Sequence, residues 1–315
     1  MTDYKTLKGF DVKVVTSDPS PVALGQMWYN STDSQLRVNK TAETWTEGNN
    51  LNDTRKNAWG FGIQTAAVAI DGSGLSPPNS TEEYDGTSWT EQNDTNNAKS
   101  NHAAFGIQTA GWAGDNNDSE EYDGTSWTET TDLGTERSSA AGFGTQTAGA
   151  AVGGYTTAAV GLTEEYNGAS WAESGDLNTA GNNTGASGTQ TAGLAMGGDG
   201  SRMAGGETEE YNGTGWTESG DLNEGRYHFG RGGTQTATLV AGGGDDNNSP
   251  LYLDSAETYN GTSWATATEI NTTRIGVGGC GTTAAAVIWG GNTGSLQNLS
   301  EEWSSAAAVQ DVTSS

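Results

Sequence analysis

A pair of aromatic residues that recurs along the chain constrains its fold more than any other feature. The pattern Tyr-[Asp/Asn]-Gly-x-x-Trp occurs five times, at residues 84–89, 122–127, 166–171, 211–216 and 259–264. Asp-Gly or Asn-Gly between two strand-like runs predicts a tight type I′ hairpin, whose turn needs positive φ at two residues. Each copy therefore predicts two antiparallel strands, and one or two glutamates precede each tyrosine, such as Glu82 and Glu83.

A second motif, close to Gly-x-Gln-Thr-Ala, lies at a constant distance from the first. Its glutamine follows the preceding tryptophan by 19 positions in every repeat, and the six residues in this position are Gln64, Gln108, Gln146, Gln190, Gln235 and Thr283. A strand of small residues follows, which indicates close approach of backbones. All length variation lies between this position and the next tyrosine, from 14 to 24 residues, so we expect one variable loop per repeat on a single face.

The first and last repeats are incomplete in a complementary way. The first tryptophan, Trp45, precedes the first complete repeat, whereas the last repeat ends at Glu301-Glu302-Trp303 without its final strand. This arrangement is expected of a ring in which an N-terminal strand completes the last sheet, because a ring leaves no long exposed sheet edge. We therefore predict an all-β, six-bladed β-propeller over residues 36–305, with an arm at 1–35 and a tail at 306–315. Segments 36–38 and 301–303 compete for one strand position, and the sequence leaves both open.

The repeats resemble the kelch family of β-propellers. The resemblance covers residues 45–305 and rests on a basic residue four positions after Leu or Ile, on paired glycines that end a strand, and on the Tyr–Trp spacing. It implies kelch-like blades. The first two repeats depart from the pattern with Asp71-Gly72 and Gly114-Asp115, and the units are shorter than the roughly 50 residues of a kelch repeat. The marks of the WD family and of the sialidase Asp-box are not matched.

Basic residues recur nine positions before the glutamine position. They are Arg55, Lys99, Arg137, Arg226 and Arg274, with Gly181 in the fourth repeat. One hypothesis pairs each of them with a repeat glutamate and thereby joins neighbouring blades; the alternative is an anion site near the axis. We expect the repeated Tyr and Trp side chains to pack between blades rather than to stack on sugars.

The chain offers little catalytic chemistry. His102, His228 and Cys280 are its only histidines and its only cysteine, and the Glu-Glu pairs recur in every blade instead of marking one acid–base site. We therefore predict no enzymatic activity and no cofactor. Calcium remains an alternative for the oxygen-rich segments 115–118 and 245–248, for which solvated turns are the competing interpretation.

The N-terminal segment 21–38 reads as a hairpin and contains Gly-Gln-Met-Trp28-Tyr29-Asn. This stretch is similar to segments of tail-fibre and other structural proteins of tailed bacteriophages, which implies attachment to a virion through Trp28 and Tyr29. The alternative is an extra strand pair that seals the ring. No apolar run long enough for a signal peptide or a membrane span is expected, and the net charge of -27 disfavours nucleic acid and anionic lipid as partners.

The variable loops are the expected binding surface, although neutral drift in loop length explains them equally well. Candidate binding residues on the loops are Pro77, Pro78, Tyr155, Arg202, Met203, Asp245, Asp246, Asn247 and Tyr252. The sequence therefore favours a multimeric, non-enzymatic virion component, a tail fibre, adhesin or particle decoration, that contacts other virion proteins and a host surface glycan or protein. The alternatives are an intracellular kelch-type interaction scaffold and a glycan-acting propeller enzyme.

Overall fold

The computed structural model describes residues 12–75, 78–99, 102–200, 202, 206–245 and 251–312. These residues form strands, bridges and turns, and no helix occurs among them. The chain divides into two compact units: Met1–Thr44 together with Ser304–Ser315, and Trp45–Trp303. Within the segment expected as a tail, residues 306–311 belong to strand β28, which ends at Asp311.

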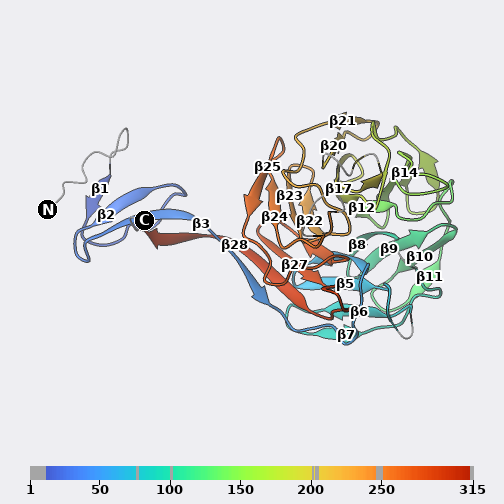
Figure 1. Ribbon diagram of the computed structural model, residues 1–315, viewed down its shortest axis with the longest axis horizontal. Coiled ribbons are helices and arrows are strands. Elements are labelled where there is room, and N and C mark those ends of the chain that lie inside the picture. Colours follow the sequence, from blue (N-terminus) through green and yellow to red (C-terminus); the bar gives the residue numbers. More distant parts are fainter. Residues whose placement is uncertain are drawn as a thin grey trace. The chain divides into compact units, whose positions relative to one another are not determined.

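The larger unit is built from small antiparallel sheets of consecutive strands (Figure 1). Five sheets have four strands each: β4 (Trp59–Ile63), β5 (Ala66–Ile70), β6 (Thr81–Tyr84) and β7 (Trp89–Glu91); β8 (Ala103–Ile107), β9 (Ala110–Asp115), β10 (Asp118–Tyr122) and β11 (Trp127–Glu129); β12 (Ala141–Thr145), β13 (Ala148–Val152), β14 (Thr163–Tyr166) and β15 (Trp171–Glu173); β17 (Gly185–Thr189), β18 (Ala192–Met196), β20 (Thr208–Tyr211) and β21 (Trp216–Glu218); β22 (Gly230–Thr234), β23 (Ala237–Ala241), β24 (Ala256–Tyr259) and β25 (Trp264–Ala267). A short pair, β16 (Gly181–Asn182) and β19 (Asp199–Gly200), accompanies them.

The last sheet combines both ends of the chain. Its order is β1-β2-β3-β28-β27-β26, so a strand from the N-terminal region lies beside the C-terminal strand. Its strands are β1 (Lys13–Val15), β2 (Met27–Asn30), β3 (Gln35–Glu47), β26 (Gly278–Gly281), β27 (Ala285–Trp289) and β28 (Ser300–Asp311). The two segments expected to compete do not, because residues 36–38 pair with β2 and residues 301–303 belong to β28.

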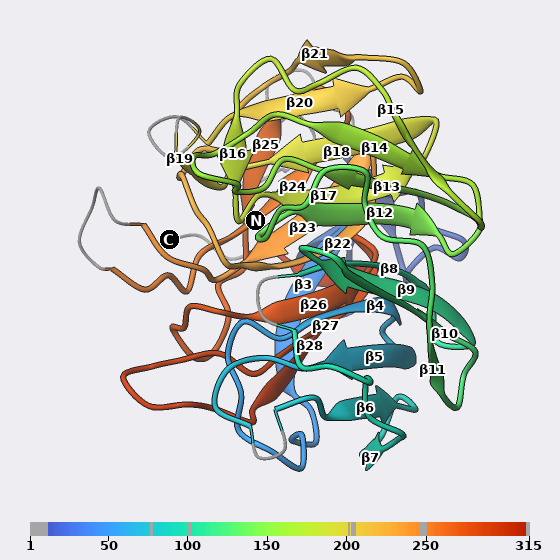
Figure 2. The same ribbon diagram turned by 90° about the vertical axis from the view of Figure 1, so that its right-hand side faces the viewer.

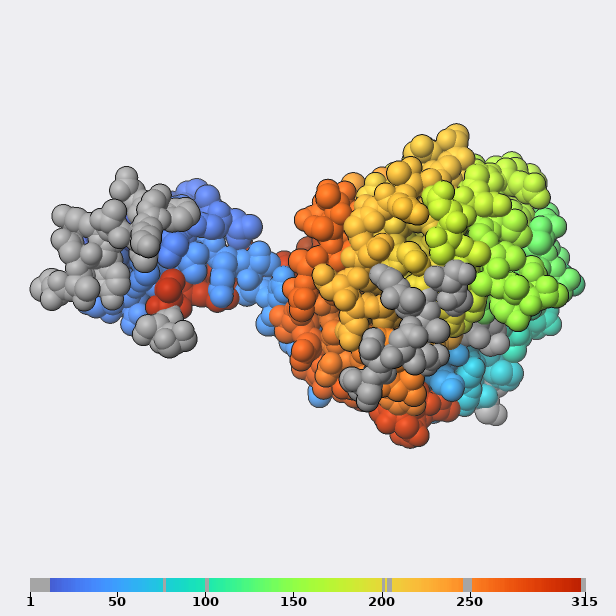
Figure 3. All heavy atoms as spheres, turned by 45° about the horizontal axis from the view of Figure 1, so that its top comes forward, coloured from blue at the N-terminus to red at the C-terminus, as the bar shows by residue number. Residues whose placement is uncertain are grey.

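The innermost strand of each sheet contacts the innermost strands of two others. The contacts run from β4 through β8, β12, β17, β22 and β26, and β26 contacts β4 again. Figures 1 and 2 show the sheets arranged around these strands, and the surface of the larger unit in Figure 3 follows the same order by colour. The architecture of the larger unit is therefore β-propeller-like.

Six apolar clusters form the core, and each joins two neighbouring sheets. One of them, for example, combines Phe61 and Val68 of the first sheet with Ala113 and Trp127 of the second. The tryptophan at the start of an outermost strand thus packs on the preceding sheet. This confirms the prediction that the repeated aromatic side chains pack between sheets.

The hairpin between the third and fourth strands is confirmed, but its predicted type I′ turn is wrong. Positive φ occurs at Gly86 and at the corresponding glycines, and the preceding Asp or Asn has none. Instead, the Asp85 carboxylate accepts hydrogen bonds from the backbone N–H groups of Thr87 and Ser88, both at 2.7 Å. The side chain of the Asp or Asn therefore closes a longer, four-residue loop.

Candidate functional site

The basic residues of the repeat are buried, and each forms an ion pair with a glutamate of its own sheet. Arg55 precedes β4 and pairs with Glu82 of β6, and neither side chain reaches solvent. The other pairs are Lys99 with Glu120, Arg137 with Glu164, Arg226 with Glu257 and Arg274 with Glu301. Pairing with the repeat glutamates is confirmed. The prediction that these pairs join neighbouring blades is wrong, because both partners belong to one sheet.

Backbone groups complete the environment of these cations. The Arg274 guanidinium donates to the carbonyl oxygens of Gly290 at 2.8 Å and Leu299 at 3.0 Å, besides its bond to Glu301 at 2.9 Å. Burial lowers the pKa of Arg274, and the adjacent Glu301 carboxylate opposes that shift. The charge is neutralised inside the sheet, so this ring of cations leaves no free charge for an external anion.

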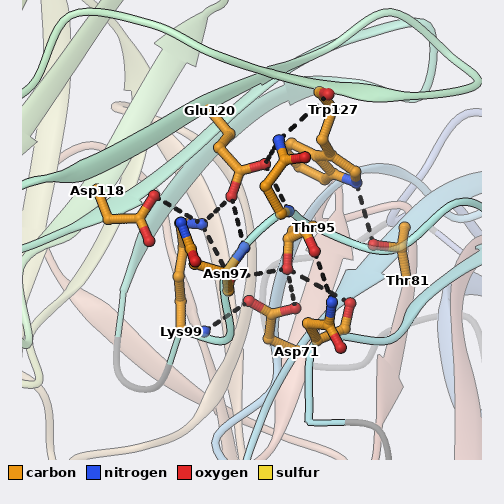
Figure 4. A network of polar contacts seen from close by, with 10 residues as sticks. Asp71, Thr81, Thr95, Asn97, Lys99, Asp118, Glu120 and Trp127 are labelled. Carbon is orange, nitrogen blue, oxygen red and sulfur yellow. Dashed lines mark hydrogen bonds and ion pairs between the residues drawn. The ribbon is translucent and has the colours of Figure 1, made fainter.

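Figure 4 shows how the network around Lys99 also reaches the preceding sheet. The Lys99 ammonium pairs with Glu120 and lies 3.3 Å from Asp118. Its backbone N–H donates to the Asp71 carboxylate at 2.9 Å, and the Thr95 hydroxyl donates to the same carboxylate at 2.8 Å. Asp71 follows β5, so its side chain joins the first sheet to the segment that enters the second.

Two titratable side chains in this region, Asp71 and His102, are buried and have shifted pKa values. Burial raises the pKa of Asp71 to about 7, although the hydrogen bonds from Thr95 and Lys99 act in the opposite direction. Burial lowers the pKa of His102 to about 3, and the positive charge of Lys99 adds to the shift. His102 is fully buried and therefore neutral in the folded protein at neutral pH. It contacts no solvent and is not positioned as a general base.

In each consecutive Glu-Glu pair, the second glutamate contacts a different partner from the first. The Tyr166 hydroxyl donates to Glu121 of the preceding sheet at 2.7 Å, and Tyr211 and Tyr259 do the same to Glu165 and Glu210. Tyr84 of the first sheet donates in the same way to Glu302 of the last. Within each pair, one carboxylate neutralises a cation of its own sheet and the other binds the next sheet.

The repeated glutamines bind neighbouring sheets through two hydrogen bonds each. The Gln146 amide donates to the carbonyl oxygens of Gly111 and Tyr122 in the preceding sheet, both at 3.0 Å. Gln64 of the first sheet donates to Ala286 and Trp303 of the last at 3.1 and 2.9 Å. The first and last sheets are thus joined by the same contacts as consecutive sheets. In the sequence these glutamines stand out only by their constant spacing from the tryptophan.

Arg202 is fully buried and is not presented on the loop surface as expected. Its guanidinium lies 2.5 Å from Glu209 and donates to the carbonyl oxygens of Thr179 and Gly197. Arg137 makes the equivalent contacts one repeat earlier. A Cβ added to Gly181, which occupies the usual basic position, would lie 2.3 Å from the Arg202 Cδ. Arg202 therefore supplies from a loop the cation that Gly181 lacks.

The remaining loop candidates differ in their exposure. Pro78 is exposed and Tyr155 is 45% exposed, whereas Tyr252 is half-buried. Asp245 is 2% exposed, contrary to the expectation of a surface contact. Candidates outside the described residues are Pro77, Met203, Asp246 and Asn247. The described loops leave the sheets between the second and third strands, at equivalent positions in successive repeats.

In the smaller unit, Trp28 is a core residue and Tyr29 is half-buried. The Trp28 indole donates to Asp18 at 2.9 Å, and Arg37 pairs with Asp18, Asp33 and Asp311. The hydrogen bond from Arg37, followed by those from Trp28 and Asn30, lowers the pKa of Asp18 to about 2. Trp28 is therefore committed to folding this unit and cannot at the same time serve as an external contact.

The proposed calcium segments hold no recognisable ion site in the described part of the chain. Asn116 and Asn117 form the turn between β9 and β10, and Asp118 is the neighbour of Lys99. No cluster of three or more His, Cys, Asp or Glu side chains in the described ranges is arranged to hold a metal ion. Nor do these ranges include a helix with the length and apolarity needed to cross a membrane.

A cavity of about 110 Å³ lies where the six innermost strands meet. Three consecutive residues of each strand line it: 60–62, 104–106, 142–144, 186–188, 231–233 and 279–281. The first residue of each triplet is Gly or Ala in five strands and Arg231 in the sixth. In the sequence Arg231 stands four positions before the glutamine, where the other repeats have Gly or Ala, and it was not among the predicted site residues.

Comparison with known proteins adds no identification. No family model matches the chain, and no curated protein is significantly similar to it.

Proposed function

We propose that the larger unit is a six-bladed, kelch-like β-propeller in which β3 closes the last blade, and that the chain is a non-enzymatic component of a tailed-phage virion. The strand order β3-β28-β27-β26 supports this closure, as do the bonds from Gln64 and Tyr84 to the last sheet. A ring whose remaining sheet edges are short suits a particle surface, where a long unpaired strand invites aggregation.

The chemistry that recurs in each repeat supports a structural role. The acidic residues that could serve as catalytic pairs are already engaged, one with a buried cation and one with a tyrosine of the next sheet. A general acid or base must reach a substrate, and a carboxylate held in a buried ion pair does not. The repeat therefore supports a rigid scaffold on which loops can vary.

The smaller unit is the proposed attachment module, and its surface is the single observation that carries this function. Val14, Leu24, Val309 and Val312 are 41% to 63% exposed there, half of the large exposed apolar side chains found in the described chain. Exposed apolar residues on a small, separate unit favour contact with another protein. We assign this contact to a virion protein because of the phage-like segment around Trp28, which builds the core of the same unit.

The test is the composition of purified particles from the producing culture. We expect the chain at a fixed copy number, as measured by mass spectrometry, and a defined position by electron cryomicroscopy. Leu24→Asp and Val309→Asp should reduce that copy number, because each places a charge on the proposed contact. Ile107→Asp is the matched control, since Ile107 is 55% exposed on the larger unit. Absence of the wild-type chain from particles would contradict the virion assignment.

The loop residues are the proposed host contact. Tyr155→Ala or Tyr252→Ala should slow adsorption of particles to host cells without changing the copy number of the chain. Unchanged adsorption would limit the role of the chain to coating or assembly. Recovery of a stoichiometric intracellular partner, together with absence from particles, would favour the alternative of a kelch-type interaction scaffold.

A further inference from the structure

Arg231 differs from the other buried arginines of the larger unit because it lacks a carboxylate partner. Its side chain is 8% exposed, and no Asp or Glu among the described residues lies within ion-pair distance of it. Its Nε donates to the Ala186 carbonyl oxygen at 2.9 Å, and its guanidinium carbon lies 4.4 Å from the ring centroid of Trp59. These contacts satisfy one donor and one face of the guanidinium.

The position of Arg231 directs this unneutralised charge at the axial cavity. Arg231 lines that cavity, and Gly60, Ala104, Gly142, Ala186 and Gly279 occupy the equivalent positions on the other innermost strands. The strand β22 lies two sheets from β4, so the side chain extends past β26 to reach Trp59. Because the equivalent positions on the other five strands hold only Gly or Ala, no second large side chain from this position fills the cavity beside Arg231.

A buried cation without a counter-charge is costly, and this cation stays charged. Burial lowers the pKa of Arg231 to about 10, which still leaves it protonated at neutral pH. Buried charges in proteins are normally paired or coordinated, because a low-dielectric surrounding does not replace hydration. The Trp59 ring face provides partial compensation. The remaining guanidinium donors of Arg231, which lines the cavity with no described acidic group beside it, favour an anion.

We propose that the axial cavity binds a small monovalent anion, a halide or a carboxylate of formate or acetate size, against the guanidinium of Arg231. A volume of about 110 Å³ accommodates such an ion with some water. A single guanidinium balances one negative charge and can hold a carboxylate through two parallel hydrogen bonds. The net charge of -27 repels multivalent anions more strongly than monovalent ones.

Bromide tests the site in the wild-type protein without any substitution. Crystals grown or soaked in sodium bromide should show an anomalous peak in contact with the Arg231 guanidinium inside the cavity. A map with bromide at surface sites and none in the cavity would show that the cavity does not bind a halide. Formate soaks examined at high resolution test binding of a small carboxylate. Absence of both bromide and formate from the cavity would overturn the proposal.

Thermal unfolding tests the same site in solution. At constant ionic strength, replacement of gluconate by chloride, bromide, formate or acetate should raise the unfolding temperature saturably by a few degrees, because a ligand stabilises the state that binds it. Arg231→Gln should abolish this saturable rise, since it removes the charge and keeps most of the volume. Lys40→Gln, which removes one charge from an exposed side chain of the smaller unit, should retain it.

The ion series also separates the proposal from general salt effects. An equal rise with gluconate, or an unchanged rise in Arg231→Gln, would show screening of the acidic surface instead of binding and would overturn the proposal. If Arg231→Gln fails to fold, Arg231→Met provides the second neutral variant. An anomalous bromide peak without any saturable rise in solution would also count against the site.

Discussion

Gly181 and Arg202 show that the buried ion pair of each repeat is defined by a position in space. In four repeats an arginine precedes the innermost strand, and in the second repeat Lys99 does so. In the fourth repeat the glycine at that position leaves room for Arg202, which arrives from the loop between β18 and β20. Glu209 thereby keeps a partner, as the buried carboxylate requires.

We predict that Arg202→Ala destabilises the protein strongly and that Gly181→Arg rescues it. Loss of Arg202 leaves Glu209 buried without a counter-charge, at a cost of about 3–5 kcal/mol. Gly181→Arg alone should also destabilise, because its Cβ meets Arg202, whereas the double variant should regain most of the stability. Urea unfolding of the four proteins measures the coupling. Additive losses in the double variant would contradict this exchange of roles.

Asp71 predicts a defined dependence of stability on pH. Its pKa is raised to about 7 in the fold, so the folded state binds a proton that the unfolded state has released above its ordinary pKa near 4. Stability should therefore decrease as pH rises from about 4 to 7. Asp71→Asn should remove this decrease.

The measurement is the difference in unfolding free energy between wild type and Asp71→Asn at each pH. This difference cancels other titrating groups, including His102, whose lowered pKa destabilises the fold as pH falls below about 6.5. A pH-independent difference would indicate that Asp71 ionises normally in the folded protein.

At the scale of elements, five of the six contacts between neighbouring sheets share the same polar bonds. The exception joins the fifth sheet, β22–β25, to the last sheet. There Thr283 replaces the glutamine, Thr258 replaces the second glutamate, and Trp303 replaces the tyrosine. Acceptor and donor are lost together, and the apolar cluster around Trp45, Ile288 and Trp303 packs this contact instead. The three replacements therefore occur together at one contact, and none leaves an unpaired glutamine, glutamate or tyrosine there.

We predict that the glutamine bonds contribute measurably wherever they occur. Gln146→Ala should destabilise by about 1–3 kcal/mol, because it leaves the carbonyl oxygens of Gly111 and Tyr122 without these donors. Thr283→Ala is the matched control at the exceptional contact and should cost less. Chemical unfolding followed by tryptophan fluorescence compares the two variants. Equal losses of unfolding free energy in the two variants would contradict a contribution from the glutamine hydrogen bonds between sheets.

At the scale of the whole molecule, the last sheet depends on strands from both ends of the chain. β3 lies beside β28, and the rings of Trp45 and Trp303 lie 5.2 Å apart in the apolar cluster that joins this sheet to its neighbour. The same two strands continue into the smaller unit, where the Val312 N–H donates to the Leu36 carbonyl oxygen at 2.8 Å. One pair of strands therefore contributes to both units.

This arrangement predicts different outcomes for two truncations. Removal of residues 1–34 deletes β1 and β2 but keeps β3, so the larger unit should unfold near the wild-type denaturant concentration. Removal of residues 1–47 deletes all of β3 with Trp45, whose loss alone should cost about 3–5 kcal/mol, and exposes an edge of β28. We expect a much lower unfolding midpoint and aggregation for the longer truncation. Equal stability of both proteins would contradict the contribution of β3 to the last sheet.

Much of the fold could be predicted from sequence because the repeat is periodic. The constant spacing of Trp45, Trp89 and their equivalents to the glutamine position placed the strands, the sheets and the buried aromatic residues. The glutamates were recognised as partners of the basic residues. The turn type was wrong because a side chain of Asp or Asn can close a loop in place of a second residue with positive φ.

The sequence by itself determined the all-β architecture, the number of repeats and the pairing of a basic residue with a glutamate in five of the six repeats, because these depend on spacing and residue type. Only the tertiary structure decided which charges are neutralised. It buried Arg202 in the place left by Gly181, and it left Arg231 without an acidic partner beside the axial cavity. The physical reason is that a charge is satisfied by its neighbours in space, and the spacing of a repeat does not show which side chain reaches them.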